Sequence, residues 1–168
     1  LQQVHMPEVP KPIDPVWSTH LIDRFIRAKQ EDAGLQPAPD AEAYVLLRRL
    51  SLILTGLPPT PAEVAEFDAE IARNPTDGYE ILADRLLDSP HFGERWARHW
   101  MDVVRYTETH GNEWNYEVHH AWRYRDYVID AFNKDIPYDR FMAEQLAGDL
   151  LKEPKTDYTL RLAGLGFQ

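Results

Sequence analysis

Cysteine is absent from the 168 residues of this chain. Without a thiol, the chain has no disulfide framework, no zinc–thiolate site, no cysteine nucleophile and no covalent attachment point for c-type haem. The same absence fits a reducing cytosol and an oxidising exterior equally, so it leaves the compartment open. Long apolar runs are also missing. The longest run is Ala43–Leu47. A transmembrane helix needs about 20 apolar residues, so no membrane span is expected.

Basic residues are few, with 18 lysines and arginines against 28 acidic residues and a formal charge of −10. Nucleic-acid binding is driven by basic side chains that neutralise phosphates, so this balance argues against a nucleic-acid partner. Segments in which apolar and polar residues alternate, which would indicate strands, do not occur either. The length suits one domain.

Proline, glycine and capping residues divide the chain. Four prolines within Met6–Pro15 predict an extended linker over residues 1–15, followed by a single helical domain over residues 16–168. The apolar end, Leu160–Gln168, leads us to expect that this domain continues beyond the C-terminus. Helices are expected over residues 18–33, 40–54, 90–106 and 121–133, and around residues 138–146. Two more helices are expected to begin at residue 60 and just after residue 77.

Two helix starts carry specific signals. Asp40 is the expected cap of the second helix, and Thr60-Pro61-Ala62-Glu63 has the pattern of a capping box with proline at the first helical position. Together the segments predict an all-α fold, an irregular domain of about seven or eight helices that is part of a larger polypeptide.

Aromatic residues and histidines gather in the second half, where 12 of the 19 aromatics and five of the seven histidines lie between His91 and Phe141. A core is the better interpretation, because one predicted helix repeats apolar residues at helical spacing: Trp96, Trp100, Val103 and Val104. His99 lies at the border of this stripe, one turn from Asp102. That pair could orient a ligand or shuttle a proton. The alternative is that Asp102 only provides a hydrogen-bond partner for His99.

Arg125 lies in the middle of the apolar half of the helix over residues 121–133, which contains Trp122, Tyr124, Val128, Ile129 and Phe132. A guanidinium in apolar surroundings needs a carboxylate, and the downstream candidates are Asp139, Glu144 and Asp149. Gln145 falls inside the next apolar stripe. The two helices are therefore expected to share a buried hydrogen-bond network, which either fixes their register or forms the floor of a site.

The loop between these helices brings Glu108, His110 and Glu113 within six residues. Zinc, iron and manganese accept such ligands, so the loop is a candidate site for a divalent metal. The spacing matches no closed motif such as HExxH, and the alternative is a polar loop bonded to itself. The candidate residues for a binding cleft are His99, Asp102, Trp114, His120 and Arg125.

Longer strings resemble closely the planctomycete cytochrome-c-associated domain of unknown function, over nearly the whole chain from about residue 13. The matching strings are Leu54–Pro61, Ser89–Trp100, Ala121–Ile129, Pro137–Phe141 and Glu144–Leu151. The resemblance implies a large exported protein, periplasmic or extracellular, in which a cytochrome-c-like domain precedes this one, a planctomycete-specific domain follows, and a lectin-like insertion sometimes lies between. Any haem would belong to the preceding domain.

The resemblance carries no established activity. Many members of that family have a second histidine in the loop where this chain has Asn112. Two hypotheses follow. The first is a non-catalytic helical module that binds a neighbouring domain, such as the cytochrome-c domain, or a carbohydrate. The second is a metal-dependent redox or hydrolytic enzyme centred on Glu108, His110 and Glu113.

Overall fold

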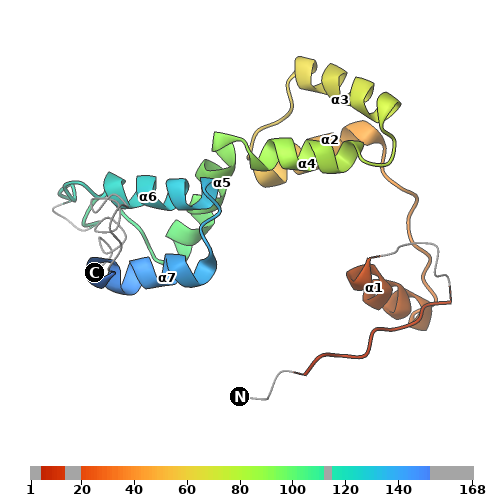
Figure 1. Ribbon diagram of the computed structural model, residues 1–168, viewed down its shortest axis with the longest axis horizontal. Helices are drawn as coiled ribbons and strands as arrows, with labels where there is room; N and C mark the ends of the chain where they lie inside the picture. The colour runs from red at the N-terminus through yellow and green to blue at the C-terminus, as the bar shows by residue number, and fades with distance from the viewer. Residues whose placement is uncertain (1–4, 14–19, 112–114, 152–168) are drawn as a thin grey trace. The chain divides into compact units, whose positions relative to one another are not determined.

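The computed structural model describes residues 5–13, 20–111 and 115–151. Within them the chain forms seven α-helices, one short 3-10 helix and no strand apart from an isolated antiparallel bridge (Figure 1). The predicted all-α fold is confirmed. The helices are α1 Leu21–Asp32, α2 Ala43–Leu54, α3 Pro61–Arg73, α4 Gly78–Leu87, α5 Pro90–Val103, α6 Trp122–Asn133, α7 Tyr138–Ala147 and η1 Gly148–Leu150.

The chain divides into two compact units, one within residues 1–41 and one within residues 42–168. In the first unit, the His20 ring caps α1 by accepting a hydrogen bond from the backbone N–H of Ile22. Gly34 follows the helix in the left-handed conformation, as a C-terminal stop signal requires. The predicted linker over residues 1–15 and the single domain over residues 16–168 stay predictions.

Helices α2, α3 and α4 enclose a small core built from Leu47, Phe67, Leu82 and Leu86. The predicted capping box at the start of α3 is confirmed: Glu63 accepts from the Thr60 backbone N–H at 2.7 Å, and the Thr60 hydroxyl accepts from the Glu63 N–H at 3.3 Å. The backbone hydrogen bond from Thr60 is the largest cause of the lowered pKa of Glu63. This local signal therefore fixes where α3 begins.

A second core lies among α5, α6 and α7 and contains Ala97, Tyr124, Tyr127, Val128, Ala131 and Phe141. Helices α5 and α6 run antiparallel. The Asn133 side chain at the end of α6 accepts from the Gly93 N–H at 2.7 Å and donates to the Pro90 carbonyl at 3.1 Å. A Cβ atom on Gly93 would lie 2.4 Å from the Ile129 carbonyl oxygen. The helices thus approach so closely that only glycine fits there.

Two expectations about helix detail are wrong. Asp40 does not cap α2, because the helix begins two residues later than expected, with Glu42 at the N-cap position and no side-chain cap. Val103 does not belong to a buried stripe on α5: it ends the helix and is 74% exposed, and Gly93 and Ala97 form the buried face instead. The small residues went unnoticed because an apolar stripe is read from large side chains.

None of the helices in the described part of the chain combines the length and the apolar character that crossing a bilayer demands.

Gly93→Ala tests the close approach of α5 and α6. Alanine favours a helix by about 1 kcal/mol over glycine, but its methyl group would overlap the α6 backbone. We therefore expect a net loss of about 1–3 kcal/mol in the free energy of unfolding, measured by urea denaturation. Arg98→Ala, at an exposed position on the same helix, should change it by less than about 0.5 kcal/mol. Equal midpoints for the two variants would contradict this packing.

Candidate functional site

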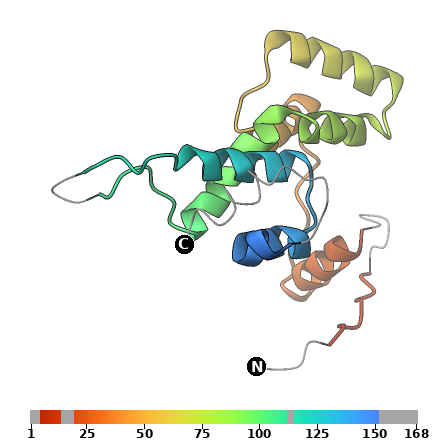
Figure 2. The same ribbon diagram turned by 60° about the vertical axis from the view of Figure 1, so that its left-hand side comes forward.

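The connection between α5 and α6 is a loop whose two sides pair with each other. Thr109 and Glu117 form the antiparallel bridge, the Val118 N–H donates to the Glu108 carbonyl at 2.8 Å, and the His110 N–H donates to the Tyr116 carbonyl at 3.0 Å. Figure 2 shows these two sides running next to each other away from the helices. The two described sides of this loop are therefore joined by backbone hydrogen bonds.

Arg125 anchors this loop to α6. Its Nη1 donates to Glu108 Oε1 at 2.6 Å and its Nε donates to Asp126 Oδ1 at 3.2 Å. The hydroxyl of Tyr106 donates to the same Glu108 oxygen at 2.9 Å. Burial alone would lower the pKa of Arg125, but the hydrogen bond and charge of Asp126 and the charge of Glu108 raise it overall.

The prediction that Arg125 needs a carboxylate is confirmed, but the predicted partners Asp139, Glu144 and Asp149 are wrong. The Arg125 side chain is 38% exposed, because the buried face of α6 centres on Tyr124, Tyr127, Val128 and Ala131. Trp122, which suggested a wider apolar face, is 46% exposed. Arg125 therefore stands at the edge of the core and faces the loop.

The proposed metal ligands are only partly described. Glu108 is bonded to Arg125 and Tyr106, His110 is exposed, and Glu113 lies outside the described residues, as does Trp114. Among the described residues, no three histidine, aspartate or glutamate side chains are grouped so that they could hold a metal ion. The metal site stays a prediction, and no observation in the described part favours it.

The other cleft candidates are dispersed. His99 and Asp102 are both described and exposed on α5, but no ion pair joins them. The His99 ring packs instead on Trp96, with ring centroids 5.3 Å apart. His120 is exposed, in a left-handed backbone conformation before α6, and its ring centroid lies 6.5 Å from that of His119. Among the members of the predicted set that the structure describes, only Glu108 and Arg125 therefore lie together.

The predicted network between α6 and α7 is confirmed with Gln145 as a member, but tyrosines take the place of Arg125. The Trp100 indole N–H donates to the Tyr124 hydroxyl at 3.0 Å, and that hydroxyl donates to Gln145 Oε1 at 2.8 Å. Nearby, the Tyr127 hydroxyl donates to Glu144 Oε2 at 3.0 Å. Arg125 takes no part. Sequence reasoning counted Tyr124 as part of the apolar stripe and left Tyr127 out, and so missed the hydroxyls of both.

Both tyrosine hydroxyls of the network are held in the neutral form. Burial raises the pKa of Tyr124 and outweighs its hydrogen bonds to Trp100 and Gln145. Burial also raises the pKa of Tyr127, and the charge of Glu144 and its hydrogen bond add to the effect. Arg140 in turn donates to Glu144 Oε1 at 2.7 Å, so this carboxylate is fully engaged. The network is therefore suited to fixing the register of three helices.

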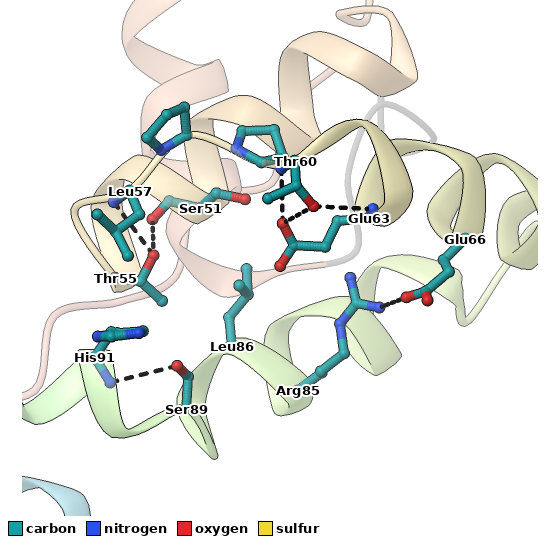
Figure 3. A pocket seen from close by; sticks show the side chains of 12 residues that line it. Ser51, Thr55, Leu57, Thr60, Glu63, Glu66, Arg85, Leu86, Ser89 and His91 are labelled. Atoms are coloured by element: carbon teal, nitrogen blue, oxygen red, sulfur yellow. Dashed lines mark hydrogen bonds and ion pairs between the residues drawn. The ribbon is translucent and has the colours of Figure 1, made fainter.

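A polar cleft of about 390 Å³ opens between the start of α3 and the start of α5 (Figure 3). Three of its hydroxyls bond to the backbone or to a carboxylate: Ser51 donates to the Leu47 carbonyl, Thr55 donates to the Ser51 carbonyl, and Thr60 donates to Glu63. Arg85 reaches across to Glu66 at 3.1 Å. Most polar groups of the cleft are thus already bonded within the protein, which leaves few of them for a ligand.

A larger groove, of about 490 Å³, lies beside the second core. It is lined mainly by apolar and aromatic side chains from α5, α6, α7 and the turn before α7: Phe92, Trp100, Ala131, Phe132, Asp135, Ile136, Pro137, Tyr138 and Phe141. We call it the aromatic groove. Phe141 is held by Trp100 and Phe132, with ring centroids 4.9 and 6.2 Å away. Ligand sites are typically concave and apolar, with few polar groups.

Sequence reasoning missed the aromatic groove. Its residues come from three helices and a turn, and none has a distinctive chemical group. The one local signal is the sequence Lys134-Asp135-Ile136-Pro137, in which Asp135 has a φ of 47°. That left-handed residue ends α6 and turns the chain back toward α5. The groove follows from this reversal, which apolar periodicity does not encode.

Tyr124→Phe tests the network. Removing the hydroxyl leaves the Trp100 N–H without its acceptor and Gln145 Oε1 without its donor. Each unsatisfied buried group costs about 1–3 kcal/mol, so we expect a loss in that range in the free energy of unfolding. Tyr138→Phe removes a hydroxyl from a side chain that is 71% exposed and should be nearly neutral. A Tyr124→Phe protein as stable as the parent would contradict the network.

Tyr106 gives a test by pH. Burial, followed by the hydrogen bond and charge of Glu108, raises the pKa of Tyr106 to about 12. Because the folded-state pKa exceeds that of the unfolded chain, the resulting stabilisation is complete below about pH 10 and is lost as the pH rises towards 12. NMR titration of the tyrosine ring carbons should place Tyr106 near this value. In a Glu108→Gln variant the pKa of Tyr106 should fall only part of the way to 10, because burial remains. A return to 10 would contradict burial as the largest cause.

The comparisons with known proteins identify a family without a known activity. Residues 21–167 match PSCyt2, described as a protein of unknown function (DUF1549). No curated protein and no solved structure matches the chain. Because the match covers all the helices described above, the chain belongs to the PSCyt2 family of proteins of unknown function.

Proposed function

We propose that this chain is a helical binding module of a larger exported polypeptide, and that it binds a neighbouring domain of that polypeptide through the aromatic groove. The groove itself carries the proposal, because it is a preformed concave surface with an aromatic floor and an apolar lining. Tyr138 stands at its edge, 71% exposed, where a partner would bury it. Exposed aromatic side chains beside a pocket are typical anchors of protein interfaces.

A protein partner fits the aromatic groove better than a carbohydrate does. Sugars need several hydrogen-bonding groups in addition to aromatic rings, but the polar side-chain groups that line this groove are the Asp135 carboxylate, the Tyr138 hydroxyl and the Trp100 N–H. The Trp100 N–H already donates to Tyr124. The remaining lining gains free energy mainly by burying apolar surface, at about 25 cal/mol per Å².

The family supports the choice of a neighbouring domain as partner. The resemblance implies a cytochrome-c-like domain before such chains, in proteins of the periplasm or the exterior, and the family name PSCyt2 supports the association with a cytochrome. The cytochrome-c-like domain is therefore the first candidate, and the planctomycete-specific domain is the second. In this proposal the chain holds the domains of one exported protein together and supplies no catalytic group.

Photo-cross-linking in the full-length polypeptide tests this function. A benzophenone amino acid in place of Tyr138 should cross-link to residues outside this chain, because a bound domain would cover the groove. The matched control carries the same amino acid in place of Tyr44, an exposed aromatic residue on α2 that does not line the groove. Mass spectrometry of the cross-linked peptides identifies the partner.

Three outcomes would overturn the proposal. Equal cross-linking from the two positions would show that the groove is no preferred contact. Cross-links from position 138 only to this chain would assign the groove to an internal segment. Cross-links only between two copies of the polypeptide, recognised by mixing isotopically light and heavy protein, would make the groove a site of self-association.

A further inference from the structure

Among the described residues that line the aromatic groove, Asp135 has the only charged side chain. It is exposed, and none of the ion pairs found among the described residues includes it. The nearby cations are engaged elsewhere: Lys134 Nζ lies 2.6 Å from Asp130, and Arg140 Nε lies 2.7 Å from Glu144. The groove therefore has one carboxylate that this part of the chain leaves unneutralised.

The position of Asp135 does not by itself call for a negative charge. A left-handed turn residue is well served by asparagine or glycine, which carry no charge. The residue also follows the C-terminus of α6, where the helix dipole makes an acidic group unfavourable. Asp139 differs, because it lies in the first turn of α7, where a carboxylate is favourable. Neither the turn nor the end of the helix therefore accounts for the charge of Asp135.

We propose that the partner segment received by the groove carries a large apolar side chain next to a lysine or arginine. This inference rests on the proposed function and adds the chemistry of the partner. The apolar side chain lies on the floor formed by Phe141, Trp100 and Phe132, and the cation pairs with Asp135 at the edge. The charge of −10 on the chain favours such a basic segment further by attraction at longer range.

Peptide display on the whole 168-residue chain tests this chemistry. Random dodecapeptides on phage are selected for binding, and those that still bind a Tyr138→Ala variant are discarded, so that only groove ligands remain. Tyr138 is exposed, so this variant should fold. We expect the retained peptides to share a leucine, phenylalanine or tryptophan adjacent to lysine or arginine. Retained peptides without a shared basic residue would overturn the inference, and so would a failure to retain any peptide.

A double-mutant cycle then assigns the cation to Asp135. Asp135→Asn keeps a residue that tolerates the left-handed backbone, and replacing the basic residue of the selected peptide with glutamine removes the other charge. Fluorescence polarisation should show a loss of about 2- to 5-fold in affinity for either change and no further loss for both together. Asp139→Asn is the matched control, with no expected effect beyond about 1.5-fold. A loss of the same size in this control would overturn the assignment.

The two experiments fail separately. If cross-linking finds a neighbouring domain but the selected peptides contain no basic residue, the function stands and its proposed chemistry falls. If basic peptides bind through Asp135 but position 138 cross-links no other domain, the chemistry of the groove stands and its partner has been misassigned.

Discussion

The close approach of α5 and α6 at Gly93 is the contact on which the aromatic groove depends. Asn133 bonds the two backbones where a side chain on residue 93 would collide with α6. This fixes the antiparallel register and places the Trp100 indole within hydrogen-bonding distance of Tyr124. The chain then reverses at Asp135, so that Phe141 of α7 packs against Trp100. A shift of one turn between α5 and α6 would break both contacts.

The fold was largely predictable because its signals are local. The capping box at Thr60 defines the start of α3 from neighbouring residues alone, and the structure shows it. The face that α6 buries was less predictable, because tryptophan and tyrosine are ambiguous on a helical wheel: Trp122 is exposed, whereas Tyr124 and Tyr127 are buried. That ambiguity made Arg125 look central, although it lies at the edge of the core.

The candidate site was hardly predictable, since it depends on residues distant in sequence. The carboxylate that pairs with Arg125 comes from 17 residues upstream, on a loop whose position helical periodicity does not determine. The groove combines side chains from α5 through α7 that are individually ordinary. Sequence reasoning selects residues with reactive groups, but of the selected residues that the structure describes, only Glu108 and Arg125 pair with each other. The lining of the groove is mainly apolar surface, which has no distinctive motif.

This distribution favours binding over proton transfer as the use of the second core. A general acid or base works best with a pKa near the ambient pH, but burial raises the pKa values of Tyr106, Tyr124 and Tyr127 further above it. The hydroxyls of Tyr124 and Tyr127 donate to α7, and the Tyr106 hydroxyl donates to Glu108 of the loop. A floor held rigid in this way loses little conformational freedom when a partner docks, so more of the free energy of apolar burial remains as affinity.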